Sequence, residues 1–488
     1  MTECPSANLA LKSFHFVPSV QVVLPYSCVI EDSVALSDLL VTDHHLSSKK
    51  MFRNAIVLIC IINYVHLGAA LYCLSADGDN FPECHMSTRT AYRYIANYND
   101  SEIKYPGCTE KKIWLFLRHG TRQPAKKVME RMNEELPALR DKILHLHQNG
   151  QAKISAEALE ELVKWNRTFD KADATKLTEE GERELTDLAE RFQSRFPILL
   201  PEVYSNRTYK MKYTATQRTE KSAESFALGL FGRQASKKVW YHPSEIKDSI
   251  LRPYKHCKRW REDVKDNKVS YEQENLFIGG KVVKDMLDDL SKRLGFPIKY
   301  GDVDLMYHSC GFETAWNSNN KSPWCKLLSL DHLKVLEYTD DLDNFWIDGY
   351  GFPITYKQSC RSLVDVFQFF NSKEDGVATI YFGHSGSMLK LLSLLGLAKD
   401  ETPLRHDSFA QHRDTRVWKT SLIDAFASNL GFVLYECEKG APGILAMHQE
   451  RVIQIPGCPQ GLPCPISTFE SIYSEIIHDC RYEEICGL

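Results

Sequence analysis

The amino-acid sequence predicts an α/β protein with a doubly wound, mostly parallel sheet as its core and an α-helical cap domain. Three separate segments support this prediction, because in each of them a short apolar or alternating run ends in polar residues and passes into a helical stretch. Strands that alternate with helices are typical of parallel sheets, which bind ligands beyond the carboxyl ends of their strands. We therefore expect the polar residues of the three segments to converge on one site.

The three strands are expected, in order, over residues 113–117, 209–214 and 377–384, and the helices that follow them after Pro124, over 216–230 and over 388–397. The first strand ends in the charged run Arg118-His119-Gly120. The third ends in Gly383-His384. Polar side chains therefore stand wherever a strand gives way to a helix.

Two charged stretches, about 125–176 and 236–349, have few long apolar strands and favour helices. We interpret them as cap insertions in a single domain over 71–488. The composition, with 43% hydrophobic and 25% charged residues in a chain of 488, is that of a globular protein. A net charge of -4 argues against a broad nucleic-acid-binding surface. Any anion site must therefore be a local cluster.

A segment over 51–70 has the pattern of a signal peptide. Basic residues precede its apolar run, and the small residues Gly68 to Ala70 follow it, which places cleavage near Ala70. The run falls short of the roughly 20 apolar residues that a transmembrane helix needs, so we expect no stable membrane span after cleavage. Residues 1–50 are interpreted as an unstructured extension. Either translation can also begin at Met51, which we favour, or this extension is the cytosolic tail of a signal-anchored form.

Removal of Cys4, Cys28 and Cys60 with the leader reduces 15 cysteines to 12, an even number that fits disulfide pairing in an oxidising compartment. Four Asn-x-Ser/Thr sequences, at Asn99, Asn166, Asn206 and Asn320, fit the same compartment. We expect a protein of the secretory pathway that is secreted, at the cell surface or in the endoplasmic reticulum lumen. No Cys-x-x-Cys pair or histidine-rich cluster has metal-ligand spacing, so neither a metal nor another cofactor is expected.

The run Arg118-His119-Gly120-Thr121-Arg122 has the chemistry of a phosphate site. Two guanidinium groups flank an imidazole, Gly120 allows close backbone approach and a helix N-terminus follows. A neutral imidazole nitrogen can attack phosphorus while Arg118 and Arg122 hold the charged oxygens. An isolated Arg-His-Gly is more often a surface charge beside a turn glycine. Its position behind a buried strand favours the functional interpretation.

This run resembles the Arg-His-Gly-x-Arg-x-Pro signature of histidine acid phosphatases, with Gln123 where the multiple inositol polyphosphate phosphatase branch often has Tyr. Other stretches are also similar to the family, at 177–181, 214–223, 310–313, 322–325 and 429–437. The resemblance implies the histidine phosphatase fold, with Arg218 as a third phosphate-binding guanidinium and His384 as the histidine of the distal motif. It also implies the disulfides Cys310–Cys325, Cys480–Cys486 and Cys108–Cys437.

Two more residues of the signature region are candidate substrate-binding residues. Thr121 lies within the signature, and Lys127, next to Lys126, matches a basic position of the inositol polyphosphate branch. A polyanionic substrate would favour such a lysine. The alternative interpretation of Lys127 is a solvated charge on an exposed helix.

The distal motif Gly383-His384-Ser385-Gly386 departs from the family at one position. In the family a carboxylic acid two residues after the histidine protonates the departing oxygen, and here Gly386 stands there. A positioned general acid contributes roughly 10²–10⁴-fold in rate. We therefore expect impaired hydrolysis of esters with poor leaving groups, such as inositol phosphates. Glu313, Glu374 and Asp375 are the other candidates for this acid, and each is more simply interpreted as a solvated surface charge.

The sequence thus predicts a phosphomonoesterase that acts on inositol polyphosphates or similar polyanionic phosphate esters. Its predicted catalytic residues are Arg118, His119, Arg122, Arg218 and His384, with a phosphohistidine intermediate on His119. The alternative is a catalytically silent protein that binds inositol polyphosphates and releases no phosphate. A purely structural extracellular protein is the third interpretation, and it would not explain two arginine motifs with both histidines.

Overall fold

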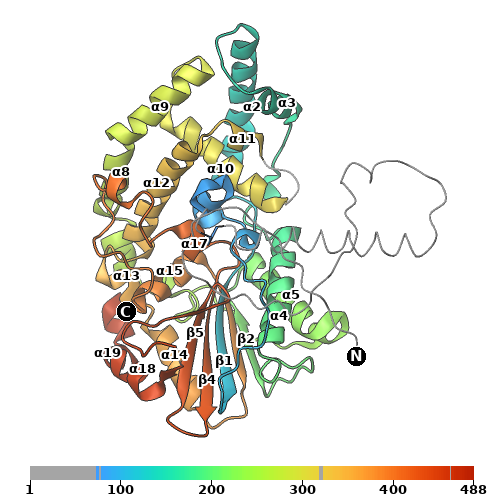
Figure 1. Ribbon diagram of the computed structural model, residues 1–488, viewed down its shortest axis with the longest axis vertical. Coiled ribbons are helices and arrows are strands. Elements are labelled where there is room, and N and C mark those ends of the chain that lie inside the picture. The colour runs from blue at the N-terminus through green and yellow to red at the C-terminus, as the bar shows by residue number, and fades with distance from the viewer. Residues whose placement is uncertain (1–72, 76–77, 318–321, 462) are drawn as a thin grey trace, which may run out of the picture. The chain divides into compact units, whose positions relative to one another are not determined.

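The computed structural model describes residues 73–75, 78–317, 322–461 and 463–488 (Figure 1). The chain divides into two units, 1–61 and 62–488, and every described residue belongs to the second. The predicted extension over 1–50 and the predicted signal peptide over 51–70 lie outside the described residues, as does the sequon at Asn320.

A mixed sheet forms the core. Its strands lie in the order β2 (Tyr209–Tyr213), β3 (Ala378–Gly383), β1 (Cys108–Arg118), β4 (Asn429–Cys437), β5 (Gly443–His448) and β6 (Arg451–Ile453), and β7 (Cys464–Pro465) pairs with β5. β2, β3 and β1 are parallel to one another. β4 is antiparallel to β1, and β5 is antiparallel to β4 and β6.

The α/β fold class is confirmed, but the sheet is mixed rather than mostly parallel. Only a few residues connect β4 to β5 and β5 to β6. Such connections make hairpins, whereas a parallel pair needs a crossover of a dozen residues or more. The strands predicted from the sequence are the three parallel ones, and the antiparallel strands were not predicted.

The central strand β1 is buried on both faces. Trp114 and Phe116 belong to one hydrophobic cluster, while Ile113, Leu115 and Leu117 belong to another. Because neighbouring side chains of a strand point to opposite faces, this division places a core on each side of the sheet. Because both faces of β1 are buried, residues 113–117 are all apolar.

Helices cover both faces of the sheet (Figure 1). α4 (Glu179–Arg195) and α5 (Gln217–Ala235) contribute side chains to the cluster that contains Leu115. α14 (Cys360–Asn371), α15 (Ser385–Leu394) and α18 (Ile466–Ile472) contribute to the cluster that contains Trp114. The shorter elements near this core are η2 (Gly78–Asn80), η3 (Pro82–His85), η4 (Ser87–Arg89), η5 (Tyr92–Tyr94), α13 (Pro353–Lys357), α16 (Phe409–His412), α17 (Thr420–Ile423), α19 (Ser474–His478) and α20 (Tyr482–Cys486).

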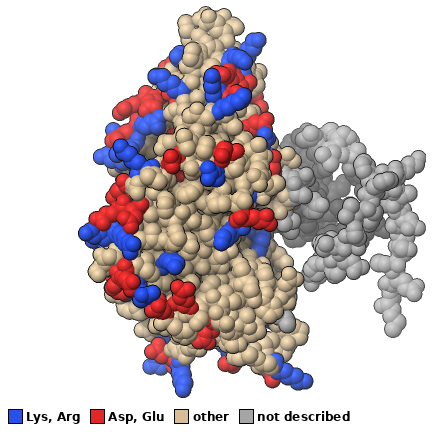
Figure 2. All heavy atoms as spheres, turned by 90° about the vertical axis from the view of Figure 1, so that its left-hand side faces the viewer, with Lys and Arg blue, Asp and Glu red and all other residues tan. Residues whose placement is uncertain are grey.

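The two stretches that were predicted to form a cap contain helices and no strand among their described residues. The first holds α2 (Lys126–Gln148), α3 (Ala156–Lys164) and η6 (Lys171–Asp173). The second holds η7 (Ser236–Lys238), α6 (Pro253–His256), α7 (Lys258–Trp260), η8 (Arg261–Lys265), η9 (Lys268–Tyr271), α8 (Glu272–Ile278), α9 (Lys281–Leu294), α10 (Tyr300–Trp316), α11 (Pro323–Lys326) and α12 (Leu330–Asp348). Their extent as domain insertions stays a prediction. On the face that Figure 2 presents, acidic and basic side chains are interspersed.

Six disulfides pair the cysteines of the described region: Cys73–Cys84, Cys108–Cys437, Cys257–Cys486, Cys310–Cys325, Cys360–Cys480 and Cys458–Cys464. Two of the three expected bridges are confirmed, and Cys480–Cys486 is wrong. α19 precedes Cys480 and packs against α14, which begins at Cys360, whereas α20 ends at Cys486 and packs against α7, which follows Cys257. The two neighbouring cysteines therefore face different helices.

Candidate active site

A cavity of about 310 Å³ lies at the carboxyl ends of the parallel strands. It is lined by Thr88, Arg118, His119, Arg122, Arg218, Tyr254, Lys255, Trp260, Arg261, Lys265, Ile347, Asp348, His384, Ser385 and Gly386. All five predicted catalytic residues are therefore brought together. They come from three segments that are far apart in the sequence.

Strand register explains this convergence. Arg118, the last residue of β1, pairs with Gly383 of β3, so that His119 and His384 both follow the same edge of the sheet. Tyr213 of β2 pairs with Phe382, and α5 begins four residues later, which places Arg218 in the first turn of that helix. Parallel strands thus deliver all the polar ends to one place.

His119 has the tautomer that a nucleophile requires. Its side chain is buried, and Nδ1 lies 2.9 Å from the carbonyl oxygen of Gly120. Because a carbonyl can only accept a hydrogen bond, Nδ1 carries the proton and Nε2 keeps its lone pair. The His384 ring stands edge-on to the His119 ring, with 5.6 Å between the centroids.

His384 is oriented by two hydrogen bonds. Arg218 Nη2 donates to its Nδ1 at 3.2 Å, so Nε2 carries the proton and donates to Thr214 Oγ1 at 2.8 Å. Thr214 is an orienting residue that the sequence prediction missed. Its position at the start of the family-like stretch 214–223, which contains Arg218, was the only available signal.

The arginines of the cavity are poorly neutralised by acidic groups. Arg118 Nη1 lies 3.6 Å from Asp424 Oδ2 and its guanidinium stacks on Phe426, but its Nε and that of Arg218 are buried without a hydrogen-bond partner among the described residues. Burial, with repulsion between the arginines, lowers the pKa of Arg122 to about 9 and that of Arg218 to about 10. The cavity therefore favours an anion.

The same field acts on the two histidines. Burial, followed by the positive charge of Arg218, holds the pKa of His119 and that of His384 well below the ordinary histidine value. Both imidazoles are therefore neutral in the protein without ligand. A neutral His119 with a free Nε2 lone pair is the form that can attack phosphorus.

A second layer holds the signature loop against α4. The carboxylate of Glu184 accepts hydrogen bonds from Thr121 N at 2.7 Å and Thr121 Oγ1 at 2.9 Å. Thr178 caps α4 by accepting from Gly181 N at 3.2 Å and donates to Thr121 O at 2.9 Å. A Cβ atom on Gly181 would lie 2.2 Å from Thr121 O, so only glycine permits this approach. This contact explains why glycine stands at position 181, at the end of the family-like stretch 177–181.

The structure separates the two candidate substrate-binding residues from the cavity. Thr121 is buried behind the loop with its hydroxyl engaged by Glu184 and does not line the cavity. Lys127 is exposed in the first turn of α2 and does not line it either. Lys127 could contact only those groups of a bound substrate that extend out of the cavity.

Glu313, Glu374 and Asp375 do not line the cavity. Glu313 is buried elsewhere, where it accepts hydrogen bonds from Trp165 and Ser309. Glu374 and Asp375 are exposed in the connection that leads into β3, at the opposite end of that strand from His384.

Two aspartates that the sequence analysis did not single out lie near Gly386. Asp348, at the end of α12, lines the cavity, and Asp424 accepts a hydrogen bond from the Ser385 hydroxyl. Burial raises the pKa of Asp424 to about 6. No local motif marks either residue, since both approach from other parts of the chain.

Known proteins share both the sequence pattern and the fold. A family model described as the histidine phosphatase superfamily (branch 2) matches residues 111–454. Multiple inositol polyphosphate phosphatase 1 of Drosophila melanogaster is 32% identical over 422 residues, which cover 83% of this chain and 88% of that protein. The protein of the same name from Homo sapiens is 26% identical over 452 residues, which cover 83% of this chain and 89% of that protein.

Solved structures agree on the fold. The phytase from D. castellii superposes with a TM-score of 0.69 at 18% identity, covering 83% of this chain and 88% of that one. The Bifidobacterium longum multiple inositol polyphosphate phosphatase in complex with phosphate superposes with a TM-score of 0.61 at 15% identity. The match covers 81% of this chain and 98% of that one. The family model and the Drosophila relative show that the chain belongs to branch 2 of the histidine phosphatase superfamily and is a hydrolase of the histidine acid phosphatase type.

Proposed function

We propose that this chain hydrolyses inositol polyphosphates or similar polyanionic phosphate esters through a phosphohistidine intermediate on His119. The observation that carries the proposal is a buried, neutral His119 whose Nε2 is free, next to the guanidinium groups of Arg118, Arg122 and Arg218. These groups hold the three oxygens on which charge resides as the phosphoryl group transfers. Neither a metal nor another cofactor takes part in the proposed reaction.

The cavity wall supports a substrate with several phosphates. Lys255, Arg261 and Lys265 line the cavity in addition to the three arginines. One phosphate needs at most the first set of cations, and the second set suits further phosphates on the same molecule. The names of the relatives from Drosophila and Homo sapiens point to the same substrate class.

We propose that the protein works outside the cytosol, secreted, at the cell surface or in the endoplasmic reticulum lumen. Six disulfides are typical of an oxidising compartment. Asn99, Asn166 and Asn206 are exposed, as glycosylation acceptors must be. Among the described residues, none of the helices combines the length and apolarity needed to cross a bilayer.

The proposal is tested by phosphate release from inositol hexakisphosphate and from p-nitrophenyl phosphate. We expect His119→Ala to lower both rates by more than about 10³-fold, because the attacking nitrogen is lost. Radiolabelled substrate should leave an acid-labile, alkali-stable phosphoryl group on the wild type and none on the variant. His145→Ala is the matched control, since this histidine is exposed on α2 and does not line the cavity.

A silent binding protein remains the competing function because Gly386 stands at the position of the family's acid. It would bind inositol hexakisphosphate through the same cations without releasing phosphate. Tight binding in calorimetry, no phosphate release and no phosphohistidine in the wild type would establish that function and refute the enzyme proposal.

A further inference from the structure

We infer that Asp348, at the end of α12, is the proton donor of the reaction and that it takes the place left empty by Gly386. This inference rests on the proposed function. It depends on three observations: the position of the Asp348 carboxyl, the chemistry of the other groups in the cavity and the way the carboxyl is held.

The Asp348 carboxyl lies where a side chain on Gly386 would begin. A Cβ atom placed on Gly386 would be 3.1 Å from Asp348 Oδ1 and 3.3 Å from Oδ2. Gly386 lies two residues after His384, and both line the cavity with Asp348. A carboxyl group is therefore present next to this turn of α15, although it comes from a different helix.

Asp348 is the only carboxylic acid among the described residues that line the cavity. The competing donors are poorer. Burial raises the pKa of the Tyr254 hydroxyl, and the Ser385 hydroxyl already donates to Asp424. Lys255 and Lys265 carry ammonium groups, which are weaker acids than a carboxyl group. An alkoxide leaving group requires a proton, and Asp348 is the best source that the cavity contains.

Lys390 holds the Asp348 carboxyl in place. This lysine of α15 is fully buried, and its ammonium group contacts Asp348 Oδ1 and lies over the rings of Trp260, at 4.4 Å, and Tyr254, at 5.1 Å. Oδ2 has no hydrogen-bond partner among the described residues, and the carboxyl is 23% exposed. One oxygen is thus fixed while the other is free to serve the substrate.

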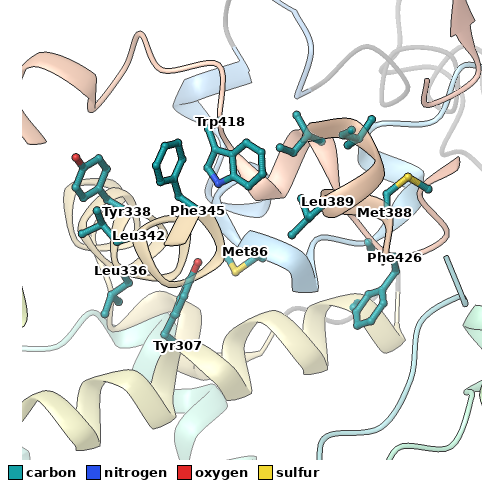
Figure 3. Packing of buried hydrophobic residues seen from close by; sticks show 14 of the residues in the cluster. Met86, Tyr307, Leu336, Tyr338, Leu342, Phe345, Met388, Leu389, Trp418 and Phe426 are labelled. Carbon is teal, nitrogen blue, oxygen red and sulfur yellow. The ribbon is translucent and has the colours of Figure 1, made fainter. Parts of the chain in front are cut away.

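The backbone on both sides of this contact is rigidly packed. Phe345 of α12 meets Trp418 edge-on, with 5.7 Å between the ring centroids, in the core that also contains Leu389 of α15 (Figure 3). A Cβ atom on Gly349 would lie 2.5 Å from the Trp418 ring, so glycine lets that ring close over the end of α12. The helix end that carries Asp348 is therefore fixed relative to α15.

His119 Nε2 forms a bond to phosphorus while the bond from phosphorus to the alcohol oxygen breaks, and the protonated Asp348 gives its proton to that oxygen. The alcohol leaves, with a phosphohistidine and an Asp348 carboxylate behind it. Water then attacks phosphorus and gives a proton to Asp348, the bond from phosphorus to nitrogen breaks with its electron pair returning to Nε2, and phosphate departs.

The test compares esters with good and poor leaving groups in wild type and Asp348→Asn. Inositol hexakisphosphate and glycerol phosphate have alkoxide leaving groups, whereas p-nitrophenolate leaves without a proton. We expect Asp348→Asn to lower kcat/KM for the alkyl esters by roughly 10²–10⁴-fold. The burst of p-nitrophenolate in the first turnover should fall by less than about 10-fold, because that step needs no acid.

Three further variants make the result specific. Asp331→Asn removes an exposed carboxylate at the other end of α12 and should leave all rates unchanged. Lys255→Met removes a cation from the cavity wall and should raise KM for inositol hexakisphosphate without selecting against alkyl esters. Asp348→Asn combined with Gly386→Glu should recover alkyl ester hydrolysis, because the side chain introduced at position 386 would start about where the Asp348 carboxyl lies, 3.1 Å from its Oδ1.

An equal loss on both classes of ester, or no loss on inositol hexakisphosphate, in a folded Asp348→Asn protein would overturn the inference. If Asp348→Asn does not fold, the double variant decides the question, because a folded double variant without alkyl ester hydrolysis also overturns it. Phosphohistidine formation in the wild type tests the proposed function separately, so the two failures can be told apart.

Discussion

Glu184 is a buried carboxyl directly behind the signature loop. It is 6% exposed and accepts three hydrogen bonds, from the backbone of Tyr92 and from the backbone and hydroxyl of Thr121. Burial nevertheless raises its pKa to about 7. The folded protein therefore retains a proton here at pH values where the unfolded chain has lost it.

The sign of the effect on stability follows from this difference. A carboxyl whose pKa is raised in the folded state stabilises the fold fully below about pH 4.5. This contribution to the free energy of unfolding is lost as the pH rises through about 7. The free energy of unfolding should fall by up to about 1.4 kcal/mol per pH unit over this range on account of Glu184. Denaturant unfolding of Glu184→Gln between pH 5 and 8 should show a flatter profile than wild type. Glu190→Gln, which changes an exposed position of the same helix, should keep the wild-type slope, and equal slopes for all three proteins would contradict the assignment.

Residues with a local motif were predictable from sequence, and residues that arrive from elsewhere were not. Arg118, His119, Arg122, Arg218 and His384 each sit at a strand end within a recognisable pattern, and the structure places all five in one cavity. Asp348 approaches from the end of α12 and Asp424 from the connection before β4. Neither the spacing nor the composition around these two aspartates indicates where they fold.

At the scale of elements, α4 and the signature loop approach each other so closely that glycine is needed on both sides. Ideal Cβ atoms on Gly120 and Gly181 would each clash with the backbone of the other segment, at 2.5 Å from Gly181 O and 2.2 Å from Thr121 O. Leu177 also forms an isolated antiparallel bridge with Arg122. The start of α4 therefore sets the position of the loop that carries His119.

Gly181→Ala should displace that loop. Overpacking of this kind costs roughly 1–3 kcal/mol, and a shift of about 1 Å at a catalytic group can lower the rate roughly 10²-fold. We expect kcat/KM for p-nitrophenyl phosphate to fall by about that factor while the protein stays folded. Gly301→Ala is the control, because a Cβ atom there meets only an ordinary contact with Arg131 at 3.7 Å. Wild-type activity of Gly181→Ala would show that the loop does not depend on α4.

The elements themselves were only partly predictable. The three parallel strands have apolar runs that end in charged motifs, whereas no such motif marks β4, which pairs with the distant β1, or β5, which pairs with β4, β6 and β7. The error at Cys480 and Cys486 has a similar origin. Six residues separate them in the sequence, yet the helices that they flank pack against different partners.

At the scale of the whole molecule, two disulfides connect the C-terminal helices to the starts of α7 and α14. Cys486 joins Cys257, next to α7, and Cys480 joins Cys360, at the start of α14. α7 ends in Trp260, which lines the cavity and lies under the Lys390 ammonium group. The C-terminal helices therefore support one wall of the cavity.

Replacement of both Cys257 and Cys486 by Ser should lower stability by roughly 2–5 kcal/mol, because a long loop is no longer closed in the unfolded chain. It should also lower activity on inositol hexakisphosphate, because α7 loses its support. Thermal unfolding and kcat/KM measure the two effects. The matched control is Cys458→Ser with Cys464→Ser, a bridge that closes only a short loop beside β7, and a loss of activity there as large as in the first pair would contradict the prediction.

The bridge between β1 and β4 has a consequence for biosynthesis. Cys108 and Cys437 are 329 residues apart, and they close the two central strands of the sheet. In the oxidising compartment that we propose for this protein, Cys108 would enter well before Cys437 and would stay without its partner until most of the chain between them has entered. Another cysteine could pair with Cys108 during that interval, so we expect an oxidoreductase that reshuffles disulfides to speed maturation.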